Sequence, residues 1–158
     1  MSDCPIAIHV QRGDFDISAV LDALGAGRTD IGAIATFTGL VRDMTKAVGG
    51  APVSAMELEH YPGMTERALH AIAVDAAARW PLQGIAVIHR YGPLTPGDRI
   101  VLVACVSPHR KAAFEAAQFV MDFLKTKAPF WKKETTPDGA RWVDARDADD
   151  LAAARWKG

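Results

Sequence analysis

The stretch Arg99-Ile-Val-Leu-Val-Ala-Cys-Val106 and the segment from Arg110 to Lys125 decide the fold. The first is almost wholly apolar and rich in β-branched residues, which predicts a strand. The second carries apolar side chains on more than one face, which predicts a helix buried on several sides or lying at a subunit contact. A dimer is compatible with this pattern. The apolar side chains of the helix are Phe114, Ala117, Phe119, Val120, Met121, Phe123 and Leu124.

The segments before this strand predict its neighbours. Residues Gly84 to Tyr91 form a second strand, and turn formers between Pro93 and Asp98 join it to the strand at Arg99, so we expect an antiparallel pair. The clearest amphipathic helix opens at Pro62 and ends before Pro81. One face of that helix carries Leu69, Ile72, Ala73, Ala76 and Trp80.

Shorter elements complete the pattern. We expect strands at 6–10, 31–41 and 53–60, and a helix that Asp16 or Ser18 caps and that ends near Gly25. A hairpin is expected with strands at 130–134 and 141–144, while 43–52 reads as a loop and an Ala-rich charged tail closes the chain. The sequence therefore predicts an α+β fold, a single domain over residues 1–158 with a mostly antiparallel sheet and packed helices.

Composition excludes several classes of protein. The 158 residues have a formal net charge of -1, which gives no overall attraction to nucleic acid or to an anionic membrane. Cys4 and Cys105 are the only cysteines, so we expect no disulfide framework and a reducing compartment. The chain has neither a secretory leader pattern nor a run of about 18 apolar residues, so we expect a soluble, cytoplasmic protein.

The charge is uneven along the chain. Between His109 and Lys133 there are six basic and two acidic residues, a local charge of +4. Together with Phe130 and Trp131, these cations suit a site for a planar, phosphorylated ligand. The alternative is a solvated helix end, because the helix dipole favours lysines in the last turn.

Other polar residues are weaker candidates for chemistry. His109 suits general acid–base catalysis, and equally a structural hydrogen bond at a helix start. Cys105 lies in an apolar run, where an inert core residue is the usual case. Glu57, Glu59 and His60 lack a second histidine at ligand spacing, so we expect no metal site. The chain contains no P-loop, Rossmann glycine fingerprint or nucleophile elbow.

Five segments in order resemble the large subunit of molybdopterin synthase. They are Thr38–Arg42, Leu58–Met64, Val87–Arg90, Ser107–Arg110 and the eleven-residue segment Leu124–Glu134. The resemblance covers residues from about 32 to 156, and five segments in one register are far more specific than any one of them. The loop 43–52 departs from the family pattern, and Pro108 stands where alanine is familiar.

The resemblance implies a sulfurtransferase of molybdenum cofactor biosynthesis, with a fold similar to an α/β hammerhead. It implies a homodimer within a heterotetramer, in which a small ubiquitin-like subunit docks at each end. The C-terminal Gly-Gly tail of that partner carries a thiocarboxylate and delivers sulfur to cyclic pyranopterin monophosphate, and two transfers form the dithiolene of molybdopterin. No cofactor, metal, membrane or nucleic acid is implied.

The resemblance also assigns a catalytic role to two lysines. It implies that Lys125 is the principal catalytic residue and that Lys132 is its helper. Both reactants are anionic, and two like charges about 4 Å apart repel by about 1 kcal/mol in bulk water and by about 4 kcal/mol at an effective dielectric of 20. Ammonium groups between the reactants would offset this repulsion.

Further residues match positions that hold the substrate or the tail of the partner. The resemblance implies that the phosphate or pterin is bound by Arg42, His109, Arg110 and Arg146, the last reaching over from the second protomer. Phe37 and Met121 are implied to line the tail channel, and the alternative for both is plain core.

Two other functions stay open from the residues alone. A non-enzymatic module would bind a phosphorylated ligand or RNA through the same basic segment, with an affinity that falls steeply with salt. A purely structural subunit would tolerate replacement of Lys125 and Lys132.

Overall fold

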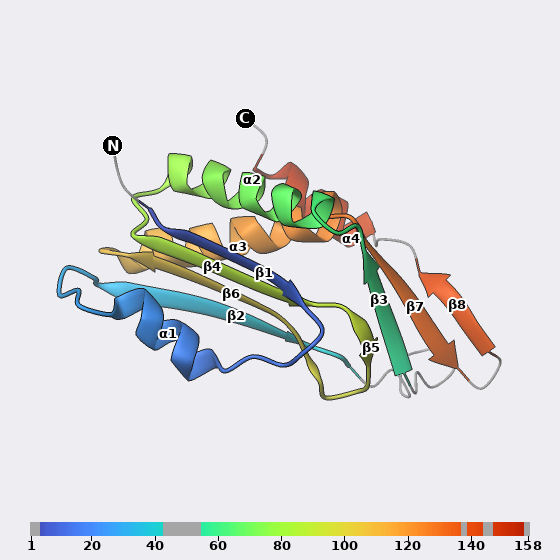
Figure 1. The fold of residues 1–158 in the computed structure, drawn as a ribbon. Helices are drawn as coiled ribbons and strands as arrows, with labels where there is room; N and C mark the ends of the chain where they lie inside the picture. Colours follow the sequence, from blue (N-terminus) through green and yellow to red (C-terminus); the bar gives the residue numbers. More distant parts are fainter. Residues whose placement is uncertain (1–3, 43–54, 137–138, 144–146, 157–158) are drawn as a thin grey trace.

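The computed structural model describes residues 4–42, 55–136, 139–143 and 147–156. These ranges contain eight strands and four helices (Figure 1). In chain order they are β1 Ile6–Gln11, α1 Ile17–Gly25, β2 Ala33–Leu40, β3 Ala55–His60, α2 Met64–Arg79, β4 Gly84–Arg90, β5 Gly92–Leu94, β6 Arg99–Ser107, α3 Arg110–Lys127, β7 Phe130–Thr136, β8 Gly139–Val143 and α4 Asp147–Ala154.

The strands form two four-stranded sheets. Sheet A has the order β1-β4-β6-β2, and sheet B has the order β5-β3-β7-β8. Within the described ranges every strand pair is antiparallel except β1 with β4, so the predicted α+β class with mostly antiparallel pairing is confirmed. Sheet B stands beside the end of sheet A at which β1, β2 and β4 finish (Figure 1).

The main core lies between sheet A and the helices α2 and α3. These two helices cover one face of the sheet, and α1 lies against the other (Figure 1). The side chain of Phe119 on α3 is fully buried, and it contacts Trp80 and Trp156 edge-on at centroid distances of 5.3 and 5.5 Å. Burial of one such aromatic side chain contributes roughly 1.5–3 kcal/mol to stability.

The predicted antiparallel pair, β4 with β6, is confirmed over six register partners from Gly84–Val106 to His89–Val101. The helix expected between Pro62 and Pro81 is α2. Its start is fixed because the Glu66 carboxylate accepts a hydrogen bond from the backbone N–H of Gly63, at a φ of 81° that favours glycine.

Two elements differ from the sequence-based expectation. The expected turn segment 93–98 begins inside β5, which pairs with β3 through Met56 and Leu94. The expected charged tail forms α4, which lies on α3, and Asp122 accepts hydrogen bonds from Arg155 and Trp156 just after α4. The loop expected at 43–52 lies outside the described residues. None of the helices described is long and apolar enough to span a membrane.

Candidate functional site

The two sheets meet at a cluster of rings. His89 of β4 stacks on Phe130 of β7, with centroids 3.8 Å apart and planes at 21°. Phe130 is the strand partner of His60 in β3, and the ring of His60 lies 4.1 Å from that of Tyr91. We call these four residues, His60, His89, Tyr91 and Phe130, the junction.

Lys125 approaches the junction from α3. It lies in the last turn of this helix, where the helix dipole favours a cation, and its side chain is exposed. The pKa of His89 is lowered mainly by burial, and the charge of Lys125 lowers it further. Because this Coulombic effect falls with distance, the amine of Lys125 lies within electrostatic range of the buried imidazole.

Lys132 approaches the junction from β7. It lies two residues after Phe130, so both side chains point to the same face of sheet B. Its strand partner is Leu58, which is buried on that face. The two lysines therefore reach the junction from different elements, Lys125 from a helix end and Lys132 from a strand.

Arg42 lies next to the same region. The preceding residue, Val41, is buried against Met56 and Leu58 of β3. The backbone of Val41 is held on both sides, because its N–H donates to the Asp98 carbonyl at 2.8 Å and its carbonyl accepts from the Gly97 N–H at 2.8 Å. The exposed Arg42 is thus anchored beside the strand that pairs with Lys132.

His89 is buried and neutral. Burial lowers its pKa to about 4, assisted by the charges of Lys125 and His60 and opposed by a hydrogen bond to the Arg90 backbone. Nδ1 lies 2.8 Å from the Arg90 carbonyl oxygen. Since a carbonyl can only accept, Nδ1 carries the proton and Nε2 has a free lone pair.

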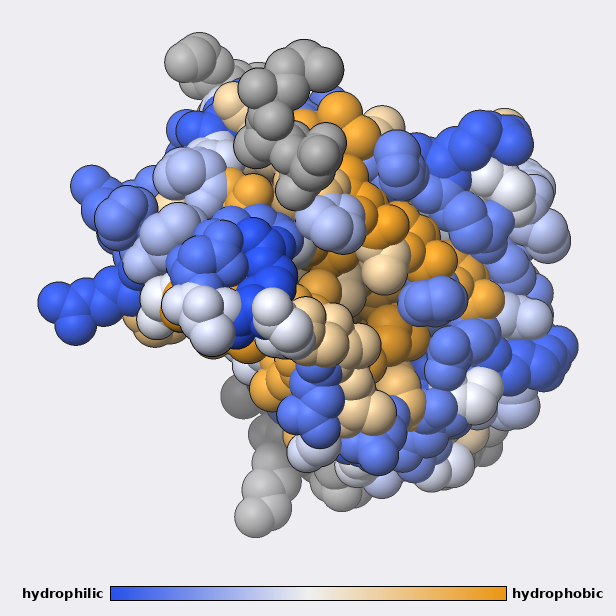
Figure 2. Space-filling model, turned by 60° about the vertical axis from the view of Figure 1, so that its left-hand side comes forward, coloured by the Kyte–Doolittle hydropathy of each residue, from blue (hydrophilic) through white to orange (hydrophobic). Residues whose placement is uncertain are grey.

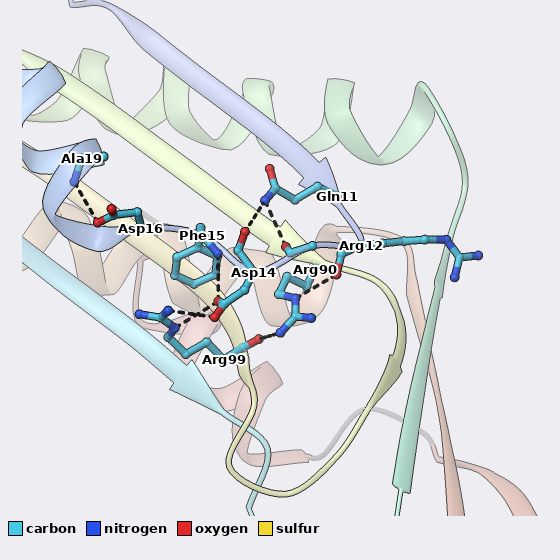
Figure 3. Close-up of polar contacts among 9 residues, drawn as sticks. Gln11, Arg12, Asp14, Phe15, Asp16, Ala19, Arg90 and Arg99 are labelled. Carbon is cyan, nitrogen blue, oxygen red and sulfur yellow. Dashed lines mark hydrogen bonds and ion pairs between the residues drawn. The ribbon is translucent and has the colours of Figure 1, made fainter.

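The carbonyl group that accepts the hydrogen bond from His89 belongs to Arg90, whose own side chain is held by hydrogen bonds (Figure 3). The guanidinium of Arg90 donates to the carbonyl oxygens of Arg12 and Arg99, each at 2.9 Å. Arg99 in turn donates two hydrogen bonds to the Asp14 carboxylate, at 3.0 and 2.8 Å. Figure 3 shows the side chains of Asp14, Arg90 and Arg99 converging at the end of β4, so the backbone beside His89 is held from residues 12–14 and from the start of β6.

Phe37 and Met121 lie on the helix-covered side of sheet A. Phe37 is 43% exposed on the edge strand β2, so it remains a candidate for contact with a partner. Met121 is 8% exposed and belongs to the main core, as the plain alternative predicted. A side chain at Gly39 would crowd Phe37, because a Cβ there would lie 3.4 Å from the ring and 2.8 Å from Val101.

His109 and Arg110 lie at the other end of α3 from Lys125. Fifteen residues of helix separate Arg110 from Lys125, a distance of about 22 Å at 1.5 Å per residue. Within one chain, the basic residues between His109 and Lys133 therefore lie in two groups, one at each end of α3.

The turn that carries His109 is rigidly held. The Ser107 hydroxyl is buried, donates to the Pro81 carbonyl at 2.9 Å and accepts from the His109 N–H at 3.1 Å. Gly32 packs against this turn so closely that a Cβ would lie 2.0 Å from the Pro108 carbonyl oxygen.

The remaining sequence candidates have these places. Arg146 lies outside the described residues. Cys105 is fully buried, and burial raises the pKa of its thiol to about 12, which confirms the core interpretation. His60 contacts the Glu66 carboxylate at 3.7 Å. No group of three or more potential metal ligands occurs in the described part of the chain.

Sequence reasoning assigned no role to His89. Its position in β4 could have indicated that His89 is buried. Side chains alternate between the two faces of a strand, so His89 lies on the same face as Ile85 and Val87, which are both in the main core. A histidine at a core position of a strand is uncommon. Its contact with Phe130 joins the two sheets, and the spacing of residues in the sequence does not predict such a contact.

Apolar surface is exposed on β2, which is the edge strand of sheet A. Ile34, Phe37 and Leu40 are 37%, 43% and 55% exposed, and Phe114 on α3 is 68% exposed. Figure 2, which brings the left-hand side of Figure 1 forward, shows a broad band of hydrophobic residues between hydrophilic borders. Exposed apolar side chains of this kind are typical of an interaction site.

Comparison with known proteins gives consistent results. Residues 10–127 match the MoaE protein family. The molybdopterin synthase catalytic subunit of Mesorhizobium japonicum is 54% identical over 152 residues, covering 95% of this chain and 92% of the relative. The molybdopterin biosynthesis MoaE protein of Burkholderia ambifaria has a similar structure, with a TM-score of 0.80, 55% identity and coverage of 99% and 98%.

A more distant structure shares the fold. It is a chain of the complex of subunits 1 and 2 of molybdopterin-converting factor from Helicobacter pylori, with a TM-score of 0.71, 19% identity and coverage of 88% of this chain and 91% of that one.

Proposed function

This chain belongs to the MoaE family, whose curated members are named molybdopterin synthase catalytic subunits, and from that premise we propose that it transfers sulfur to a pterin. The donor is the C-terminal thiocarboxylate of a small ubiquitin-like subunit, and the acceptor is cyclic pyranopterin monophosphate. Two transfers form the dithiolene of molybdopterin. The name "catalytic subunit" itself supports the presence of a second subunit.

The observation that carries this proposal is the approach of two lysines to one junction. Lys125 comes from the end of α3 and Lys132 from β7, while Arg42 is anchored nearby at the end of β2. A thiocarboxylate and a cyclic phosphate repel each other, and cations between them offset that repulsion where water is partly excluded. In this proposal Lys125 stabilises charge that develops at the attacked carbon, and Lys132 assists.

The chemistry sets the order of bonds. The sulfur of the tail forms a bond to a pterin side-chain carbon, an oxygen substituent of that carbon leaves with a proton, and a thioester then joins the tail to the pterin. Water then adds to the thioester carbonyl, the bond between sulfur and the carbonyl carbon breaks, and the tail is released as an ordinary carboxylate while the sulfur stays on the pterin as a thiolate. A cation near the carbonyl is useful in the second step because negative charge builds on the carbonyl oxygen as water adds.

The phosphate-binding residues require a second chain in this proposal. Arg110 and Lys125 are separated by about 22 Å of helix, so one small substrate does not touch both in the same chain. We therefore place His109 and Arg110 of one protomer at the junction of the other, together with Arg146. The exposed apolar side chains of β2 support such a homodimer.

Reconstitution tests the function. The purified protein is mixed with thiocarboxylated small subunit and cyclic pyranopterin monophosphate, and the dithiolene product is quantified. We expect product in proportion to thiocarboxylate consumed, and none when the Gly-Gly tail is removed. Absence of product with an intact tail would contradict the proposal. Salt-sensitive binding of simple polyanions without any partner would favour the binding-module alternative.

A further inference from the structure

Lys125 and Lys132 are joined by a short connection between α3 and β7. The helix ends and the strand begins with only Ala128 and Pro129 between them. The direction in which β7 leaves the helix therefore depends on the backbone dihedrals of these two residues. That direction sets where Lys132 lies relative to Lys125.

Proline removes most of the dihedral freedom in this connection. The ring of Pro129 holds its own φ at about −65°. A residue before proline is restricted to extended backbone, and Ala128 has a φ of -78° and a ψ of 130°. The ψ of Pro129 is the soft dihedral that remains. This angle sets the direction of the Pro129 carbonyl, so a hydrogen bond to that carbonyl holds the start of β7.

Two hydrogen bonds act on the ψ of Pro129. One is local, from the Phe130 N–H to the Ala128 carbonyl at 2.9 Å, and it closes a three-residue turn around Pro129. The other comes from the first turn of α2, where the Thr65 hydroxyl donates to the Pro129 carbonyl at 3.1 Å. Figure 1 shows the start of α2 beside the start of β7. The connection between the two lysines is thus tied to a different helix.

The Thr65 hydroxyl bridges β3 and β7 at the point where their ladder ends. The register ends at the pair of His60 and Phe130, and its next pair would be Tyr61 and Pro129. There the Tyr61 N–H donates to the Thr65 hydroxyl oxygen at 3.1 Å, and the hydroxyl donates to the Pro129 carbonyl. One side chain therefore continues the ladder past its last pair.

Thr65 is itself held rigidly. Its side chain is fully buried at the second position of α2, and its backbone N–H donates to the Tyr61 carbonyl at 2.9 Å. A carbonyl can only accept and a backbone N–H can only donate, so the hydroxyl proton of Thr65 points to Pro129. A fixed helix start therefore holds the connection that carries both lysines.

We propose that Thr65 is a positioning residue for the sulfur transfer, because its hydroxyl fixes the connection between Lys125 and Lys132 and so sets how their amines lie relative to each other. This inference rests on the proposed function, since it assumes that both lysines act on the same reactants. Precise placement matters, because a misplacement of about 1 Å can lower a catalysed rate about 100-fold.

Removal of the hydroxyl without loss of volume is the first test. Thr65→Val takes away the bridge and keeps the size of the side chain, whereas Thr65→Ser keeps the hydroxyl. We expect kcat for dithiolene formation to fall about 10- to 100-fold in Thr65→Val and less than about threefold in Thr65→Ser, with the KM for the small subunit unchanged in both. Equal kcat values of the two variants would overturn the proposal. If Thr65→Val does not fold, Thr65→Ala takes its place, because it differs from Thr65→Ser only in the hydroxyl.

The matched control is Thr126→Val. Thr126 lies next to Lys125, and its hydroxyl bonds to the Asp122 and Phe123 carbonyls of the same helix, both at 3.4 Å. This variant loses a hydroxyl beside the catalytic lysine but keeps the tie between α2 and β7, so it should keep the wild-type kcat. A loss as large as that in Thr65→Val would count against the proposal.

A second readout needs neither partner nor substrate. Residual dipolar couplings of backbone N–H groups report the orientation of β7 relative to α3. We expect this orientation to change in Thr65→Val and to match the wild type in Thr65→Ser and Thr126→Val. An unchanged orientation in Thr65→Val overturns the proposal. If the orientation changes but the wild-type protein forms no dithiolene, the tie is real and only the proposed function has failed.

Discussion

At the scale of single residues, Lys125 has an exposed side chain at a helix end. A substitution there can therefore reduce the proposed catalytic activity without lowering the stability of the fold. We expect Lys125→Ala to reduce sulfur transfer at least about 100-fold, because removal of one preorganised charge-stabilising group typically costs 10²–10³ in rate. The free energy of unfolding should change by less than about 0.5 kcal/mol, as for most surface substitutions. Single-turnover kinetics and urea unfolding measure the two effects.

The matched control for Lys125 is Lys111→Ala. Lys111 lies on the same helix, 86% exposed, in a 3.9 Å ion pair with Glu115. Such surface pairs contribute little, so both rate and stability should stay near wild type. Normal turnover in Lys125→Ala would refute its catalytic role.

The burial of His89 leads to a prediction about how the free energy of unfolding depends on pH. Its pKa is lowered from 6.5 to about 4 in the folded protein, chiefly by burial. The unfolded chain therefore binds the proton more readily, and stability that is present above pH 6.5 is lost as the pH falls toward 4. The slope approaches about 1.4 kcal/mol per pH unit in that window. Urea unfolding of the wild type and His89→Gln between pH 4 and 7 measures it. Parallel curves for the two proteins would contradict the assignment.

At the scale of elements, the turn before α3 sets the position of His109 and Arg110. A Cβ on Gly32 would lie 2.0 Å from the Pro108 carbonyl oxygen, and backbone cannot yield as a flexible side chain can. We expect Gly32→Ala to lower the free energy of unfolding by about 1–3 kcal/mol, as for other overpacking changes. It should also weaken binding of the cyclic phosphate substrate, measured by calorimetry.

Gly13→Ala is the control for this element, because a Cβ at Gly13 meets nothing within 4 Å. That variant should keep both stability and substrate affinity. If Gly32→Ala melts at the wild-type temperature, the close contact with Pro108 is not a constraint in solution.

The sequence predicted those elements whose pattern is local. Periodicity was sufficient for α2 and α3, and apolar runs for β4 and β6. β5 was missed because Gly92 and Pro93 are typical of turns, and its three residues form a strand only through pairing with β3. The parallel pairing of β1 with β4 depends on residues about 80 positions apart, which no local pattern encodes.

The candidate site was predictable only in part. The segment Leu124–Glu134 identified Lys125 and Lys132, and the structure brings both toward the junction. Counting charge along the chain placed His109 in the same basic group, whereas a helix of 18 residues separates the two ends of that group in space. The stacking of His89 on Phe130 is a contact between sheets that no sequence spacing shows.

At the scale of the whole molecule, the proposed site is built from two chains. We propose that Lys125 and Lys132 of one protomer act with His109 and Arg110 of the other, because about 22 Å of helix separates them within a chain. A chain with Lys125→Ala and a chain with His109→Ala and Arg110→Ala should each be inactive alone. In a mixed dimer, one site receives every substitution and the other receives none.

The most direct test is therefore sulfur transfer by a mixture of these two inactive variants after unfolding and refolding together. We expect recovery of about a quarter of the wild-type activity, since half of the dimers are mixed and each has one intact site. Variants refolded separately and then combined without exchange serve as the control and should stay inactive. A co-refolded mixture that is as inactive as its components would contradict a site shared between two chains.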